Sequence, residues 1–200
     1  MQLIVVDTNP TVCDAMRSVM PDADVRNCRL DEIGLDEYDV LFTPGNSYGF
    51  MDGGFDRAVR NQFPGVEQQV QRTIKDYYGG LLAVGQAFAV HSGHPNQFVV
   101  YAPTMQVPKP IYGTDNVYMA TRAAMMAVRA LVETKQVPPH RGLRILTPAF
   151  GTSAGQMVYA NAAHQMRLGF VHGQRSKDEI EAAHAWAYAW ADHNAVQPFK

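Results

Sequence analysis

Hydrophobic residues along this 200-residue chain follow two alternating patterns. Short, continuous apolar runs predict buried strands at residues 3–6, 38–43, 81–84, 98–102 and 143–149. Apolar residues at helical spacing predict helices at residues 10–20, 64–78, 115–134 and 157–168, and another helix begins near Phe55. Strands that alternate with helices in this way predict an α/β fold built in layers.

The end of the chain predicts one more helix. Ser176-Lys-Asp-Glu179 fits a capping box at its start. The apolar stripe that follows consists of Ile180, Ala183, Ala187 and Trp190. No repeat, linker or low-complexity tract divides the sequence, so we expect a single domain over residues 1–200.

Composition narrows the class of protein. Hydrophobic residues make up 46% and charged residues 18% of the chain, which is typical of a folded globular domain. With 17 basic and 19 acidic side chains, the net charge of −2 offers no basic surface for duplex nucleic acid or for a membrane. The apolar run before Asp7 is too short for a signal peptide, and no stretch approaches the ~20 apolar residues of a membrane span. We therefore expect a cytoplasmic protein, and its oligomeric state stays open.

Cysteine and histidine residues indicate neither a disulfide framework nor a metal site. The two cysteines, Cys13 and Cys28, are expected to be reduced and packed. His91 and His94 lie in a polar loop without a nearby cysteine or carboxylate, so no metal is expected there.

The first candidate site is a glycine-bearing loop between the strand at 38–43 and the helix near Phe55. Backbone N–H groups can surround a phosphate in such a loop, so Gly53, Gly54 and Phe55 are candidate ligand-binding residues, and the two glycines would allow close approach. Asn46 can hydrogen-bond a sugar hydroxyl, and Asp56 would point back toward the loop from the first helical turn. Alternatively, the glycines only form a turn and Asp56 only interacts favourably with the helix dipole.

A second loop of small residues follows the strand at 143–149. Its candidate ligand-binding residues are Phe150, Gly151, Thr152, Ser153, Ala154 and Gly155. The helix expected at 157–168 would turn its free N–H groups toward an anion. Two such loops at strand ends predict one diphosphate held between them.

Residues 151–155 also match the G-x-S-x-G motif of serine hydrolases, with Ser153 as the nucleophile. Only 47 residues follow Ser153 to supply an acid and a histidine. The available pairs are Asp178 with His184 and Asp192 with His193, and each pair would lie on the final helix. Neighbours on one helix do not readily form an ordered triad with a distant serine, so an esterase is the weaker alternative.

The two loops resemble those of the macrodomain family, whose members bind ADP-ribose and in several branches remove ADP-ribose or an acyl group from it. Asp56 follows Asn46 by ten positions, as in the family's first loop, and residues 148–155 resemble its phosphate loop. The similarity spans roughly residues 30–168 and is greatest to a bacterial and phage subgroup. It implies a three-layer sandwich with a mixed sheet between helices, and ADP-ribose as the ligand without a cofactor.

The resemblance also assigns roles. Asn46 would hold the distal ribose, and Asp56 would activate water or orient that ribose. An acid before the first-loop strand would read adenine. Asp31 is favoured over Glu32 for this role, and Ile33 would supply a backbone N–H to the base.

Four positions depart from the family pattern: Thr43 replaces an asparagine, Met51 and Asp52 replace glycines, and Ser153 replaces a glycine that can adopt positive φ. The Asp52 carboxylate would repel a diphosphate unless its side chain points to solvent. The resemblance thus implies that the protein binds ADP-ribose. Two alternatives follow for its activity: it hydrolyses ADP-ribosyl or O-acyl-ADP-ribose linkages, or it is a non-catalytic reader of ADP-ribose or an NAD metabolite.

Overall fold

The computed structural model describes residues 1–139, 142–183 and 195–196. Its strands are β1 (Gln2–Val6), β2 (Asp24–Arg26), β3 (Val40–Thr43), β4 (Phe88–His91), β5 (Phe98–Tyr101) and β6 (Arg144–Pro148). Its α-helices are α1 (Pro10–Val19), α2 (Gly54–Gln62), α3 (Val66–Tyr77), α4 (Asn116–Glu133), α5 (Tyr159–Gly173) and α6 (Lys177–Ala183). Two short 3₁₀ helices, η1 (Leu30–Glu32) and η2 (Leu35–Glu37), precede β3.

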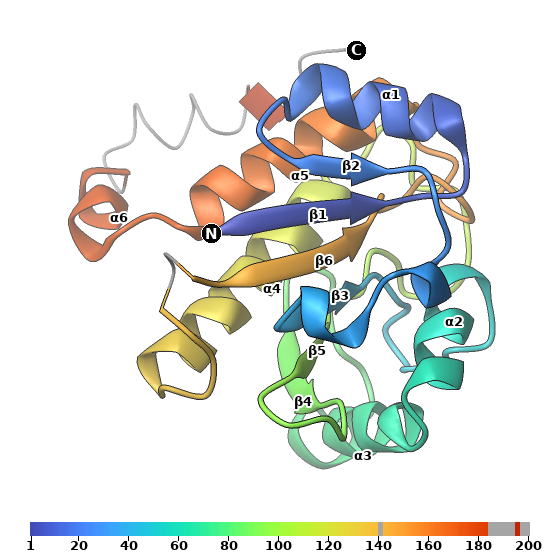
Figure 1. The fold of residues 1–200 in the computed structure, drawn as a ribbon, viewed down its shortest axis with the longest axis vertical. Helices are drawn as coiled ribbons and strands as arrows, with labels where there is room; N and C mark the ends of the chain where they lie inside the picture. Colours follow the sequence, from blue (N-terminus) through green and yellow to red (C-terminus); the bar gives the residue numbers. More distant parts are fainter. Residues whose placement is uncertain (140–141, 184–194, 197–200) are drawn as a thin grey trace.

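The described strands form one six-stranded sheet in the order β2-β1-β6-β3-β5-β4 (Figure 1). All neighbours are parallel except β4, which runs antiparallel to β5 at one edge. The sheet is therefore mixed, as expected.

Side chains alternate between the two faces of the sheet, and each face is covered by helices. Val5, Phe42 and Val100 face a core that includes residues of α1, α4 and α5. Ile4, Leu41 and Val99 face a second core built with α2 and α3. This arrangement confirms the predicted three-layer α/β sandwich.

The predicted strand at residues 81–84 is wrong. Leu82 is fully buried, but its backbone N–H donates to the carbonyl of Ser47 at 2.9 Å instead of pairing in the sheet. Gly85 then adopts a φ of +93°, which turns the chain before β4 begins at Phe88. A short apolar run can fill a core from a turn as well as from a strand, and periodicity does not separate the two.

The helix predicted at 157–168 is shifted. Gln156 has a φ of +50°, and the Met157 N–H donates to the Gly151 carbonyl at 3.0 Å, so these residues belong to the loop and α5 starts at Tyr159. The helix also continues past Leu168. A Cβ on Gly169 would lie 2.6 Å from Cβ of Thr121, so this glycine permits close packing of α5 on α4 and does not end the helix.

The capping box is confirmed at the start of α6. The Ser176 N–H donates to the Glu179 carboxylate at 2.7 Å, and the Glu179 N–H donates to Ser176 Oγ at 3.2 Å. Ala187 and Trp190 of the predicted stripe lie outside the described residues. Within the described part of the chain, no helix is both long enough and apolar enough to span a bilayer.

Candidate functional site

A cavity of about 860 Å³ lies where β1, β3 and β6 end, at the edge of the sheet to which these parallel strands point. This volume is within the range of about 300–1,000 Å³ that is usual for small-molecule sites. The loops that follow the three strands form most of its wall. Eleven of the thirteen predicted site residues line it: Asp31, Asn46, Gly53, Gly54, Phe55, Asp56, Gly151, Thr152, Ser153, Ala154 and Gly155.

The other two predicted residues, Ile33 and Phe150, are not in the wall. Both side chains are buried in the cores. The Ile33 N–H, expected to meet the base, donates to the Leu30 carbonyl at 3.1 Å within η1. The Phe150 N–H points to the Met166 sulfur at 3.2 Å. The structure thus places both residues behind the cavity, where they support its wall.

Asn46 organises the first loop. Its Oδ1 accepts the backbone N–H groups of Tyr48 at 3.0 Å and Phe50 at 3.4 Å, and its Nδ2 donates to the Phe50 carbonyl at 2.8 Å. Asn46 is 7% exposed and also lines the cavity. After these contacts one N–H of its amide remains available to a ligand hydroxyl.

The second loop lines the cavity with residues whose backbone donors have no acceptor within the described protein. Gly151 has a φ of +74°, and among the described residues the N–H groups of Thr152, Ser153, Ala154 and Gly155 have no hydrogen-bond acceptor. Elsewhere in the cavity wall, Gly53 caps α2, whose first N–H groups lack intrahelical partners. Nothing lies within 4 Å of a Cβ placed on Gly53 or Gly54, so a ligand can approach this backbone closely. The α5 terminus, expected to face an anion, does not line the cavity.

Asp56 stands in the first turn of α2 with an unusual environment. Burial, reinforced by the nearby carboxylates of Asp52 and Glu67, raises its pKa from 3.8 to about 7. The Thr43 hydroxyl donates to Asp56 Oδ1 at 2.5 Å and partly offsets this increase. Thr43 is fully buried at the end of β3. Where the family pattern has an asparagine, this chain therefore has a hydroxyl that fixes the carboxylate.

The two candidate adenine-reading acids occupy different positions. Asp31 lines the cavity, whereas Glu32 does not and accepts the Arg29 backbone N–H at 2.7 Å. Both Asp31 carboxylate oxygens accept hydrogen bonds from the Arg29 guanidinium, at 2.9 and 3.0 Å. These hydrogen bonds lower the pKa of Asp31. Asp31 is thus an ionised acceptor at this end of the cavity.

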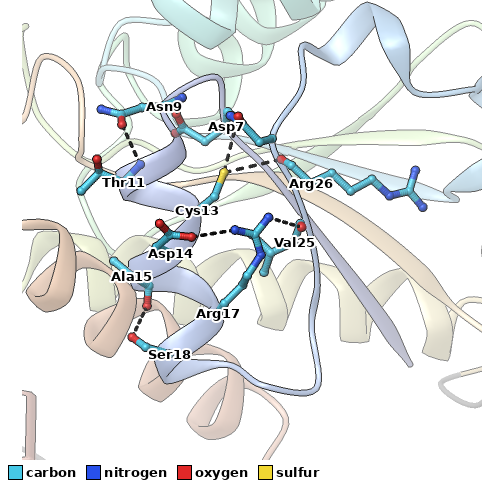
Figure 2. A network of polar contacts seen from close by, with 11 residues as sticks. Asp7, Asn9, Thr11, Cys13, Asp14, Ala15, Arg17, Ser18, Val25 and Arg26 are labelled. Atoms are coloured by element: carbon cyan, nitrogen blue, oxygen red, sulfur yellow. Dashed lines mark hydrogen bonds and ion pairs between the residues drawn. The ribbon is translucent and has the colours of Figure 1, made fainter.

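Among the lining residues that sequence reasoning missed, three carry titratable side chains at informative positions: Asp7, Cys28 and Arg57. Asp7 directly follows β1, the same position relative to a strand that singled out the other two loops. Burial raises its pKa, and its carboxylate accepts the Asn9 N–H at 2.8 Å. Figure 2 shows this turn, where the Cys13 sulfur lies 3.4 Å from the Asp7 carbonyl and 3.7 Å from the Arg26 carbonyl. Cys13 and Cys28 are both free thiols, as expected.

Of these missed residues, Arg57 indicates most about the charge of the ligand. Its side chain is exposed on the first turn of α2, lines the cavity, and has no ion pair among the residues that the structure describes. Among the described lining residues, the other basic side chain, Arg29, is bound to Asp31. Arg57 is therefore the guanidinium that an anionic ligand can reach.

The departures from the family pattern have structural explanations. Ser153 is not among the described residues with positive φ, so the expected strain is absent. Met51 is fully buried in the core beside α2 and α3, and its N–H donates to Glu67 at 2.8 Å. Asp52 is exposed, as required for a diphosphate to bind, although it also lies at the cavity wall.

The esterase alternative gains no support from geometry. Ser153 is exposed, and its hydroxyl makes no hydrogen bond to a histidine among the described residues. His184, Asp192 and His193 lie outside those residues.

A mixed sheet between helical layers, with a cavity beyond the carboxyl ends of its strands, defines an open-sheet α/β domain, a class that generally binds ligands at this edge of the sheet. Solved structures identify the particular fold. The macrodomain of Mycobacterium tuberculosis DarG is 15% identical, with a TM-score of 0.54 over 68% of this chain and 82% of that one. A mutant of the Oceanobacillus iheyensis macrodomain with ADPR is 15% identical, with a TM-score of 0.54 over 95% and 94%. The same macrodomain with ADP is 16% identical, with a TM-score of 0.52 over 82% and 87%.

This chain therefore has the macrodomain fold, as its resemblance to the family predicted. No family model matches the sequence.

Proposed function

We propose that the cavity binds ADP-ribose. The observation that carries this proposal is that two segments with free backbone donors, the 152–155 loop and the start of α2, line the same cavity. Backbone N–H groups arranged in this way are a general solution for binding phosphate. The structures of the Oceanobacillus iheyensis macrodomain with ADPR and with ADP support the same choice of ligand.

The lining residues give the ligand a direction. The diphosphate would lie between these two segments, with Arg57 as its cationic partner. Asp31 would accept a hydrogen bond from the adenine amino group, and the free N–H of Asn46 would hold the distal ribose. In this orientation the anomeric carbon lies at the end of the cavity where Asp56 stands.

Hydrolysis is the activity that Asp56 supports. A carboxylate with a pKa of about 7 is a stronger base than a carboxylate with an ordinary pKa. It can therefore accept a proton from water more readily near neutral pH. We infer that Asp56 activates or positions a water for attack on the anomeric carbon of an ADP-ribosyl linkage or on the acyl carbon of O-acyl-ADP-ribose, with the bound phosphate assisting.

Calorimetric titration with ADP-ribose, beside AMP and NAD, tests the binding proposal. We expect one-to-one binding with a Kd in the micromolar range or tighter, roughly −8 kcal/mol. Arg57→Gln should weaken binding about fivefold, as expected for an exposed charged contact. Arg72→Gln, an exposed arginine on α3 away from the cavity, is the matched control. No binding of ADP-ribose by the unmodified protein would refute the proposal.

A measurement of substrate turnover distinguishes a hydrolytic enzyme from a non-catalytic reader of ADP-ribose. With ADP-ribosylated glutamate peptides and O-acetyl-ADP-ribose as substrates, Asp56→Ala should lower the rate by ~10²-fold or more without unfolding the protein. Binding without turnover in the unmodified protein would identify a non-catalytic reader. Labelling of Ser153 by a fluorophosphonate would instead support the esterase alternative.

A further inference from the structure

A second pocket, of about 340 Å³, adjoins the cavity at its Asn46 end. It is lined by Asn46, Tyr48, Phe50, Asp52, Val107 and Pro108. Four of these six residues, Asn46, Phe50, Asp52 and Pro108, also line the main cavity, so the two spaces lie side by side and share a wall. A group attached to the end of a ligand in the main cavity can therefore enter this second pocket.

The wall of this pocket results from a strict alternation along the first loop. Ser47, Gly49 and Met51 are buried, whereas Tyr48, Phe50 and Asp52 are exposed. All three exposed side chains line the second pocket, so the loop presents them to the same space. Tyr48 is 37% and Phe50 55% exposed, and Val107 across the pocket is 48% exposed.

The exposed aromatic side chains project from a fixed backbone. The Asn46 side chain holds the backbone of both Tyr48 and Phe50, and the Gly49 carbonyl accepts a hydrogen bond from Gln71 at 3.3 Å. Gly49 has a φ of +79°, and a Cβ there would lie 3.0 Å from Val70 and Ile74 of α3. The loop thus packs tightly against α3 while it presents two aromatic rings to solvent, an arrangement typical of a binding surface.

The charges of the lining residues limit which chemical group the second pocket can bind. Asp52 is the one carboxylate among the described lining residues of this pocket, and no lysine or arginine is among them. Lys109 follows Pro108 in sequence but does not line the pocket. Aromatic faces beside a carboxylate attract a planar cation through the ring quadrupole and through direct charge attraction.

We propose that the pocket of Tyr48, Phe50, Asp52, Val107 and Pro108 binds a planar cationic group attached to the anomeric carbon of the distal ribose. The proposal rests on the proposed function, because ADP-ribose in the main cavity brings this carbon to the shared wall. Two chemical groups fit: the nicotinamide ring of NAD⁺ and the guanidinium of an ADP-ribosylated arginine.

Four ligands that share the ADP-ribose moiety test the proposal by calorimetry at low salt. ADP-ribose lacks the extra group, NAD⁺ carries a planar cation, NADH carries a neutral ring of the same size, and ADP-ribosyl-agmatine carries a guanidinium. NAD⁺ should bind about tenfold more tightly than NADH, the sum of one cation–π contact and one exposed ion pair. Of NAD⁺ and ADP-ribosyl-agmatine, the ligand that binds more tightly relative to ADP-ribose shows which planar cation, nicotinamide or guanidinium, the pocket recognises.

Substitutions in the second pocket test whether the preference for NAD⁺ over NADH arises there. Asp52→Asn and Phe50→Ala should each lower the ratio of the NADH to the NAD⁺ dissociation constant to about threefold or less, because each removes one of the two contacts. Asp76→Asn and Tyr77→Ala likewise remove a carboxylate charge and an aromatic ring, at exposed positions of α3, and should leave the ratio unchanged.

The outcomes separate this proposal from the proposed function. If ADP-ribose binds but both cationic ligands bind no more tightly than NADH, the planar-cation pocket is refuted and ADP-ribose binding stands. The same conclusion follows if the preference for NAD⁺ survives both Asp52→Asn and Phe50→Ala. If none of the four ligands binds, both proposals are refuted.

Discussion

Asp56 is a carboxylate whose surroundings oppose its ionisation. Burial and the charges of Asp52 and Glu67 raise its pKa to about 7, and only the Thr43 hydroxyl acts in the other direction. In the unfolded chain the same group ionises near 3.8. Folding therefore favours the protonated form between these two values, and stability must depend on pH across this window.

Replacing Asp56 by asparagine should make the protein progressively more stable than the unmodified chain as pH rises from about 4 to about 7. Below pH 4 both states of the unmodified chain are protonated at this position, so the difference is small. Above the window the unmodified chain has lost up to a few kcal/mol, from about 1.4 kcal/mol per pKa unit. Thermal denaturation at several pH values measures the difference, with Asp76→Asn as the control. A difference that stays constant with pH would contradict the raised pKa.

Replacing Thr43 by valine should raise the pKa of Asp56 further. Valine has nearly the shape of threonine but cannot donate the 2.5 Å hydrogen bond that stabilises the ionised carboxylate. NMR titration of the Asp56 carboxyl carbon measures this directly and needs no turnover. An unchanged titration midpoint would show that Thr43 does not act on Asp56.

At the scale of elements, the 151–155 loop should bind through its backbone. Gly151→Ala would place a Cβ 2.6 Å from Val117 at a φ of +74°, and we expect it to weaken ADP-ribose binding about fivefold or more, from strain of about 1–3 kcal/mol. Ser153→Ala keeps the backbone N–H and should change the affinity by less than about twofold. Calorimetry on both variants makes the comparison. A large loss with Ser153→Ala alone would indicate that the serine hydroxyl takes part.

Most elements could be predicted from the sequence because their apolar spacing is regular, as in α1, α3 and α4. The prediction failed where an apolar residue serves another purpose, as Leu82 does in its turn, and where Gly169 permits helix packing instead of ending a helix. Glycine loops after strands correctly indicated the cavity. The same reasoning did not indicate Asp7 or Arg57, because a single polar residue after a strand or in a helical turn carries no spacing signal.

At the scale of the whole molecule, the cavity depends on residues that are far apart in sequence. The ends of β1, β3 and β6 supply its walls, and these strands are neighbours only in the folded sheet. The lining residues that the structure describes carry four carboxylates, of Asp7, Asp31, Asp52 and Asp56, and two guanidinium groups, of Arg29 and Arg57. Binding of a diphosphate must therefore come mainly from backbone donors, which exist only when the loops are folded.

A ligand held in this way should stabilise the whole fold. At a free concentration 100 times its Kd, ADP-ribose should add about 2.7 kcal/mol to the free energy of unfolding. For a chain of this length each kcal/mol corresponds to about 2–4 °C, so the midpoint of thermal denaturation should rise by about 5–10 °C. AMP at the same concentration reaches only the adenosine end and one phosphate subsite, and should give a clearly smaller shift. Equal shifts with the two ligands would mean that the second loop and the Asn46 end contribute nothing to binding.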